Sequence, residues 1–339
     1  MTPPRKRTSS LGPPGKRTAT ALAFALSFAT ISAAHAQAPT EPATAAAPAP
    51  PAPAPPAPYS IPWGLRPIVA PTVVRLDTSV ARYEDRAANG GLGAASLLTA
   101  SYRIPGTGPQ GAGLAPLVRV ALATDAPPSG SGGLALVNPL VGAAYAVKLD
   151  GGFRLNAFLG ATVPVGMGGG DTPEAGALGA RSKGPNARAQ LDNALFAVND
   201  FTVIPGLGAA WVRDGWTIQL EATLLQLTRV RGEAVQKEAS KTNMTTGLHV
   251  GYFVLPYLSL GTELRYQRWL NAPFAVERDP SGASRDAMTF ALGPRFHLEV
   301  GSVGWLRPGI AYQRGLDRPL ASAALNYHIV QIDIPFLFK

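Results

Sequence analysis

A two-residue alternation of apolar and polar side chains constrains this chain more than any other feature. In LSLGTELRYQRWL, residues 258–270, the leucines fall on one face of an extended strand, and Glu263, Arg265 and Gln267 fall on the other. One face must therefore be dry and the other wet. A soluble sheet would bury the leucines in a core, whereas an outer-membrane barrel would turn them toward lipid and the charges toward a lumen.

The same alternation recurs along the body of the chain, without long helical periodicity. It marks about twelve strands, an even number as in single-chain bacterial barrels. The expected strands are centred on residues 72–83, 93–104, 114–124, 134–149, 152–165, 201–213, 215–229, 243–254, 257–269, 286–299, 303–314 and 322–338. The alternation skips at 224–230 and 327–332, where we expect a bulge or a switch of parity. The pattern predicts an all-β fold: a single antiparallel up-and-down transmembrane β-barrel.

The connections between these strands sort into two kinds. Links after even-numbered strands are mostly tight, and Asp150-Gly151 and Asp214-Gly215 are hairpin signals. The longer link PGTGPQGAG after the second strand is the exception. Links after odd-numbered strands are mostly longer and polar or glycine-rich. Outer-membrane barrels place tight turns at the periplasmic rim and long loops outside, whereas a soluble sandwich has no reason to sort its loops in this way.

The N-terminal residues predict export. A basic stretch, the apolar run 21–31 and the small-x-small site Ala34-His35-Ala36 define a signal peptide over residues 1–36. Its apolar run is too short to span a membrane as a helix. Residues 37–64 form an Ala/Pro-rich linker that we expect to be disordered and extended. Residues 65–339 then form the outer-membrane barrel.

Charge and cysteine content exclude several classes of protein. Residues 1–36 hold five of the 30 Lys and Arg and none of the 21 Asp and Glu, so the remainder carries 25 minus 21, or +4. This modest charge gives no reason to expect nucleic acid as a partner. The chain has no cysteine, which removes disulfides, thiolate metal sites and a cysteine nucleophile.

The C-terminal strand carries a resemblance to a known class. NYHIVQIDIPFLF alternates apolar with polar residues and ends in Phe338, one residue before Lys339. It resembles the signal by which the barrel-assembly machinery recognises bacterial outer-membrane proteins. NPLVGAAYAVKLDGGFRLNAFLGATVPVG, residues 138–166, resembles the channel-like barrels associated with phenol-degradation operons, in which a GxxY strand leads through a hairpin to a strand ending in Pro-x-Gly. The resemblance implies a porin-like or channel-like barrel in a Gram-negative cell outer membrane.

The wet face of the strands predicts the lining of a lumen. The expected lumen-lining charges, eight basic and five acidic, are Arg75, Asp77, Arg103, Arg119, Lys148, Arg154, Glu221, Glu263, Arg265, Arg295, Glu299, Arg307 and Asp333. Two interpretations are open. The charges line a polar pore with a slight preference for anions or small polar solutes, or they pair across the interior and stabilise a plugged barrel.

The longest loop, residues 166–199, also has two possible interpretations. Loops of this length are usually functional or disordered. The loop either folds into the mouth as a constriction or stays a mobile surface loop. A constriction would bring its charged residues to the narrowing: Asp171, Glu174, Arg181, Lys183 and Arg188.

Enzymatic and cofactor motifs do not emerge from the sequence. His249, His297 and His328 fall on the predicted lumenal face of different strands, with no GxSxG elbow and no HExxH pair. The glycine-rich GGLG and GMGGG stretches lack the lysine of a phosphate loop. We therefore expect no enzyme, no catalytic residues, no cofactor and no metal site.

Two hypotheses of function follow from the sequence. The first is an outer-membrane channel for passive or facilitated passage of small solutes. The second is a structural or surface-interaction barrel with a plugged lumen, acting through its loops or linker. The expected partners are outer-membrane lipid, the barrel-assembly machinery, small solutes and, through the linker, the cell wall. A soluble exported β protein is a third interpretation, which predicts solubility without detergent.

Overall fold

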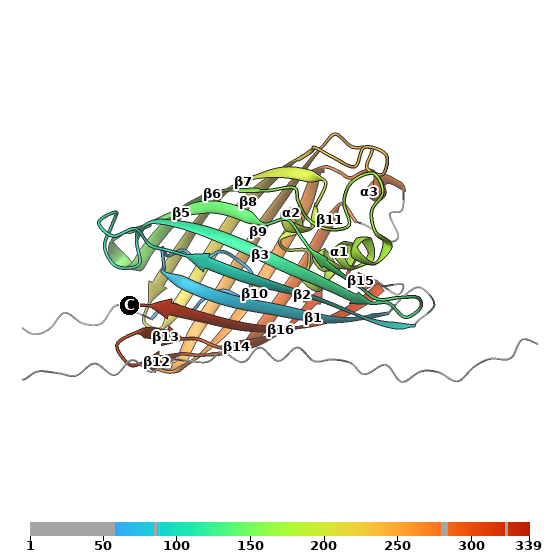
Figure 1. Cartoon of the computed structure of the whole chain (residues 1–339). Helices are drawn as coiled ribbons and strands as arrows, with labels where there is room; N and C mark the ends of the chain where they lie inside the picture. The colour runs from blue at the N-terminus through green and yellow to red at the C-terminus, as the bar shows by residue number, and fades with distance from the viewer. Residues whose placement is uncertain (1–57, 85–86, 88, 279–283, 323–324) are drawn as a thin grey trace, which may run out of the picture. The chain divides into compact units, whose positions relative to one another are not determined.

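The computed structural model describes residues 58–84, 87, 89–278, 284–322 and 325–339. Antiparallel strands form a closed ring in which β16 pairs with β1 (Figure 1). The ring consists of β1 (Val73–Glu84), β2 (Gly90–Ser101), β3 (Gly113–Ala126), β5 (Leu140–Lys148), β6 (Phe153–Thr162), β7 (Asp200–Arg213), β8 (Trp216–Arg229), β9 (Ser240–Leu255), β10 (Leu258–Asn271), β11 (Asp286–Phe296), β14 (Gly309–Gly315) and β16 (Leu325–Phe338). The predicted all-β barrel of twelve strands is confirmed. The expected signal peptide and residues 37–57 of the expected linker lie outside the described residues.

Three of the expected strands are interrupted. β4 (Gly133–Leu136) pairs separately with β3, ahead of β5, and Pro139 stands at this break. β13 (Gly304–Leu306) is separated from β14 by a break containing Pro308. Proline has no N–H to donate to a ladder, which explains both positions. β12 (Leu298–Val300) is separated from β11 by His297, whose N–H donates instead to the Tyr257 carbonyl across 2.9 Å.

The expectation of a bulge or a switch of parity at 224–230 and 327–332 is wrong. β8 pairs with β9 in constant register, and β16 pairs with β1 in constant register. Leu225, Leu227 and Ile329 point inward and are buried, because the lumen itself is apolar at this end of the barrel. The polarity of the interior changes along these strands while the backbone remains regular.

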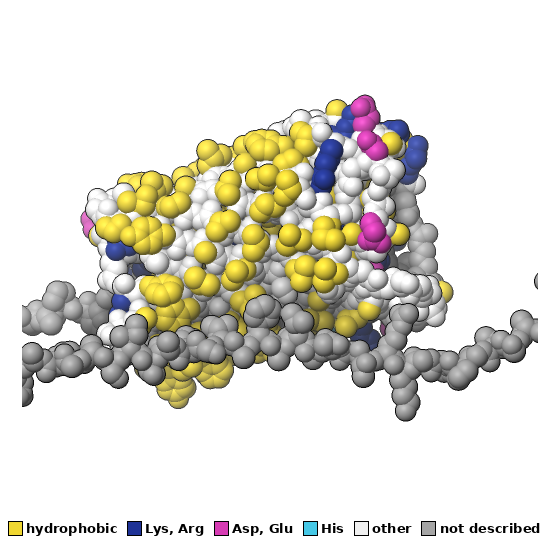
Figure 2. All heavy atoms as spheres, in the orientation of Figure 1, with side chains coloured by type: hydrophobic (Ala, Val, Ile, Leu, Met, Phe, Trp, Pro, Cys, Tyr) yellow, Lys and Arg dark blue, Asp and Glu magenta, His cyan; other side chains and the backbone are white. Residues whose placement is uncertain are grey.

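The outer wall of the barrel is apolar. Leu260 and Leu264 are 46% and 43% exposed, whereas Glu263 and Arg265 between and beside them are 1% and 2% exposed. Figure 2 shows hydrophobic side chains across the strands, with charged side chains gathered toward the two ends. None of the helices in the described part of the chain is long and apolar enough to cross a membrane. The alternation therefore resolves with leucines outside and charges inside, the arrangement that suits a barrel in lipid.

The two rims of the barrel differ as the sequence predicts. The hairpins β5–β6, which contains the 3-10 turn Asp150–Gly152, and β12–β13 lie at the rim that also carries the C-terminus (Figure 1). The opposite rim carries the longer connections, with α1 (Ala175–Ala187), α2 (Asn193–Phe196), α3 (Phe274–Arg278) and the short strand β15 (Ala321–Ser322). We call these the turn rim and the loop rim.

Candidate functional site in the barrel lumen

Buried ion pairs line the inner wall. Asp333 on β16 accepts from Arg75 Nε across 2.7 Å and from Arg295 Nη2 across 2.5 Å. On β10, Glu263 accepts from Arg265 Nε across 2.9 Å. Asp333, Glu263 and Arg295 are at most 1% exposed. A charge removed from water this completely is tolerated because partners on the same wall compensate it.

The lumen also contains the segment that precedes β1, residues 58–72, which we call the plug segment. Its apolar side chains are buried inside the barrel: Tyr59, Ile61, Trp63, Leu65, Ile68 and Ala70. The sequence places the end of the linker at residue 64. The structure differs, because residues 58–64 are part of the ordered interior of the barrel and not of a linker.

Charged wall residues hold the backbone of the plug segment. Glu263 accepts from the N–H groups of Trp63 and Gly64, the latter across 3.1 Å. The Trp63 carbonyl accepts from Arg75 Nη2 across 2.6 Å and from Gln331 Nε2 across 2.9 Å. Hydrogen bonds to charged groups stabilise by about 1.5–3 kcal/mol each. The same Glu263 and Arg75 keep ion-pair partners on the wall, so they stay paired whether or not the plug segment is seated.

A groove of glycines in the wall receives the plug side chains. At each of these positions an added Cβ would lie only 2.2–2.7 Å from a plug atom. The facing pairs are Gly208 with Ile68, Gly247 with Leu65, Gly251 with Ser60, and Gly309 with Trp63. Any larger wall residue would have to displace the plug or move itself. The wall is therefore shaped to fit this particular segment.

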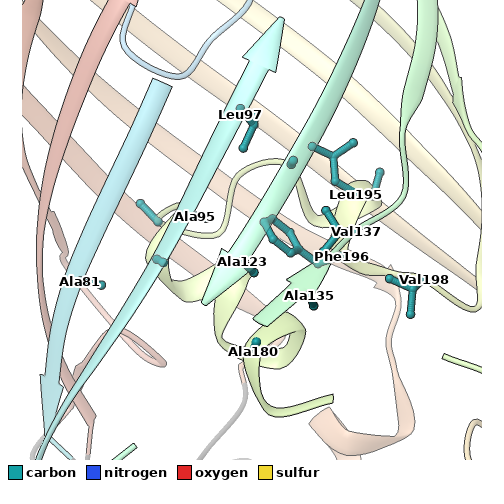
Figure 3. Packing of buried hydrophobic residues seen from close by; sticks show 14 of the residues in the cluster. Ala81, Ala95, Leu97, Ala123, Ala135, Val137, Ala180, Leu195, Phe196 and Val198 are labelled. Atoms are coloured by element: carbon teal, nitrogen blue, oxygen red, sulfur yellow. The ribbon is translucent and has the colours of Figure 1, made fainter. Parts of the chain in front are cut away.

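Residues 166–199 fold into the loop end of the barrel, and we call them the helical insert. Ala177 and Ala180 of α1 are at most 1% exposed and belong to one buried cluster with Ala81, Ala95 and Ala123 of the wall (Figure 3). Leu195 and Phe196 of α2 belong to the same cluster. Small side chains on both sides let the helix approach the strands closely, so the insert fills one side of the lumen. The expected alternative of a surface loop is wrong.

The charged residues of the insert do not gather at one narrowing. Of the five predicted charges only Arg188 pairs with the charged wall: its guanidinium lies 2.8 Å from Asp77 of β1 and 3.1 Å from Asp192 of the insert, which itself pairs with Arg119 of β3 at 3.2 Å. Burial lowers the pKa of Arg188, but these two carboxylates outweigh it and hold the pKa above its ordinary value. Arg181 Nε donates to the Gly168 carbonyl, and the Lys183 ammonium lies over the Tyr83 ring.

Asp171 and Glu174 are exposed, contrary to the expected constriction. Glu174 caps α1 by accepting from the N–H groups of Ala177 and Gly176. These two bonds hold the pKa of Glu174 below its ordinary value. The role of Glu174 is thus to start the helix, because a carboxylate satisfies N–H groups that have no partner within the helix.

Cavities remain in the described interior of the barrel. Two small ones, of about 50 and 70 Å³, are lined by both the plug segment and the insert, and each has room for a few water molecules. A larger cavity of about 320 Å³ lies at the loop end, lined by Trp269, Lys241 and Asn193 among others. Asn193 Nδ2 donates to Gln267 Oε1 across 2.6 Å, which joins the insert to the wall beside this cavity.

The structure places the predicted lining residues in three settings. The residues that lie on the inner wall near the plug or the insert are Arg75, Asp77, Arg119, Glu221, Glu263, Arg265, Arg295 and Asp333. Toward the turn rim are Arg103, Lys148, Arg154 and Arg307; Arg307 donates to the Tyr59 carbonyl, and Arg154 lies over the Tyr59 ring.

Glu299 alone occupies the third setting, and the prediction that it lines the lumen is wrong. It is exposed on the short hairpin β12–β13 and pairs with Lys339. The break at His297 ends the alternation, so the parity of β11 does not carry into β12. His328 also differs from expectation, because it points outward and contacts the Tyr312 hydroxyl at 2.7 Å.

Sequence reasoning missed the plug segment and one buried pair. The signal for the plug was the run YSIPWGLRPIV, where aromatic and branched residues replace the Ala/Pro tract. The pair is Ser259 and His297, whose Oγ and Nε2 lie 2.8 Å apart. Within the described residues His297 Nδ1 has no hydrogen-bond partner, so no carboxylate orients the ring as a catalytic triad would require.

Comparisons with known proteins found likeness in solved structures only. No family model and no curated protein matches the chain. An outer-membrane channel from Pseudomonas putida F1 is similar with a TM-score of 0.49 and 12% identity, over 83% of this chain and 100% of that one. The NanC porin has a TM-score of 0.44 and 10% identity, over 78% and 99% of the two chains. The KdgM porin, solved with disordered oligogalacturonate, has a TM-score of 0.44 and 11% identity, over 78% and 100%.

The architecture of the chain itself defines its class. The strands close without a free edge, the outer wall is apolar and the charges face inward. A closed barrel satisfies all its backbone groups internally, which lipid demands. The protein is an outer-membrane β-barrel.

Proposed function

We propose that the protein is an outer-membrane channel for small solutes that rests in a closed state, with its own plug segment seated in the lumen. The observation that carries this proposal is the way the plug is held. Its side chains occupy a glycine groove, while two of the charged wall residues that bind its backbone, Glu263 and Arg75, also have ion-pair partners on the wall. Withdrawal of the plug therefore leaves Glu263 and Arg75 paired on the wall, frees Glu221 from Arg66 of the plug, and leaves a polar lumen behind.

The charge of the lining supports a preference for anions or small polar solutes. Without Glu299, the predicted lining residues comprise eight basic and four acidic side chains. Rings of charged side chains set the selectivity of a pore. The helical insert stays in place when the plug leaves, and its contact with Gln267 would set the narrowest point on the loop side.

A second candidate is a structural barrel that acts through its external loops and never conducts. The observation in its favour is that two separate segments, the plug and the insert, fill the lumen. The two candidates differ in one property. A closed channel opens spontaneously for part of the time, whereas a structural barrel does not.

Single-channel recording of the refolded protein in a planar bilayer tests the proposal. We expect discrete openings from a low baseline, and a reversal potential displaced toward the anion equilibrium potential under a salt gradient. Folding is checked independently by heat-modifiable migration in electrophoresis. A folded protein that never conducts would contradict the channel and favour the structural barrel. Cation preference would contradict the role of the arginine-rich lining.

A further inference from the structure

Three cationic or titratable side chains lie side by side on the outside of the barrel. His328 of β16 is directly opposite Arg82 of β1 on one side and Arg314 of β14 on the other. Arg82 and His328 are exposed and Arg314 is half-buried. Their neighbours in the sequence, Tyr83, Tyr327 and Gln313, are buried in the lumen, so the three side chains share the outward face. We call them the outer basic cluster.

The outer basic cluster stands at the end of the apolar wall. Along β16 the outward residues from the turn side are Ile334, Ile332 and Val330, which are 40%, 48% and 42% exposed, and His328 comes next. The cluster therefore lies at the level where lipid tails give way to headgroups on the loop side. At the same end of β8 and β9 the outward residues are uncharged: Gln226, Thr228, Ser240 and Thr242.

The arginines of the cluster have no carboxylate partner among the described residues. Within the described residues, Arg314 Nη2 contacts Asn326 Oδ1 at 3.4 Å, and Arg82 has no ion pair there. The nearby acids of the described residues have other partners or positions. Asp317 accepts from the Met288 N–H across 2.7 Å, and Glu84 lies two residues farther out along β1. Elsewhere on the outer face, Arg268 is neutralised by Asp286 at 3.2 Å.

We propose that the outer basic cluster binds the phosphorylated headgroup of an outer-leaflet lipid. Guanidinium groups match phosphate with paired, charge-assisted hydrogen bonds. His328 and Asn326, which contact each other, add polar side chains next to the arginines. The apolar strands directly below supply a surface for acyl chains, which free phosphate would not use. Basic residues beside a membrane wall are an established way to recognise anionic headgroups.

Native mass spectrometry of the full protein, stripped of lipid in detergent, tests this site. The probe is a bisphosphorylated glycolipid of the lipid A type, compared with the same lipid after phosphatase treatment. We expect binding of the phosphorylated form only. Arg82→Gln and Arg314→Gln should each raise the dissociation constant about fivefold, and the double variant about 25-fold. A fivefold change corresponds to about 1 kcal/mol of binding free energy per arginine.

Arg268→Gln is the matched control, because that arginine is exposed on the same outer face and already paired. It should leave the dissociation constant within about twofold. Equal loss in Arg268→Gln, equal binding of the dephosphorylated lipid, or an unchanged double variant would overturn the proposal. Displacement of the lipid by inorganic phosphate at similar concentration would assign the cluster to free phosphate instead. Heat-modifiable migration confirms that each variant is folded, and the outcome does not depend on whether the lumen conducts.

Discussion

Deletion of Tyr59–Ala70 is expected to convert the protein into a steadily open pore. These residues fill the lumen and contribute to the lining of both small cavities. The minor state of a two-state protein is typically populated at about 0.1–10%, so removing the plug should raise the time-averaged current at least about tenfold. The measurement is the mean current per inserted protein in a planar bilayer.

A matched control for this deletion is removal of residues 42–53, the same length of Ala/Pro tract. That variant should conduct like the unmodified protein. If both deletions behave alike, the plug segment does not close the pore. If the Tyr59–Ala70 deletion folds and stays silent, the helical insert alone blocks the lumen and the structural barrel is favoured.

Asp333→Ala is expected to destabilise the barrel strongly. Asp333 is fully buried and is the shared acceptor of Arg75 and Arg295. Removing one member of a buried ion pair leaves an uncompensated charge and costs about 3–5 kcal/mol. Denaturant unfolding in detergent micelles, followed by intrinsic fluorescence, measures the loss. Surviving pores should also become more selective for anions, because the lining loses a negative charge.

The control for Asp333 is Asp286→Asn on the outer face. Its pair with Arg268 is 39% and 44% exposed, and exposed pairs contribute at most about 1 kcal/mol. A similar loss of stability in the two variants would show that the buried ion pairs of Asp333 contribute no more to the free energy of unfolding than an exposed pair does. Unchanged selectivity in Asp333→Ala would place this carboxylate away from the path of ions.

Much of the barrel could be predicted from the sequence because the two-residue alternation of apolar and polar side chains is visible within each single strand. Alternation in each strand reports which side faces lipid, and Leu264 beside Glu263 and Arg265 is placed correctly without knowing any neighbour. The same logic failed where the interior is itself apolar. Leu225, Leu227 and Ile329 face inward onto the insert, and only the three-dimensional position of a distant loop makes that favourable.

The plug segment shows the second limit of sequence reasoning. Its aromatic residues have no strand period, and the compositional tract before it suggested that the linker continued to residue 64. The groove that receives it is built from Gly208, Gly247 and Gly251, which lie on β7 and β9. Within one strand such glycines look like ordinary weak points. Their common purpose appears only when the strands are assembled around Ile68 and Leu65.

A reversible crosslink between the plug segment and the wall tests whether the plug segment closes the pore. A Cβ at residue 247 would lie 3.2 Å from Leu65 Cγ, so Leu65→Cys with Gly247→Cys brings two thiols within disulfide range. The chain has no other cysteine. In one bilayer recording, the oxidised double variant should be silent and should begin to open when reductant is added, while each single variant conducts throughout. Openings of equal frequency before and after reduction would show that the plug segment does not close the pore.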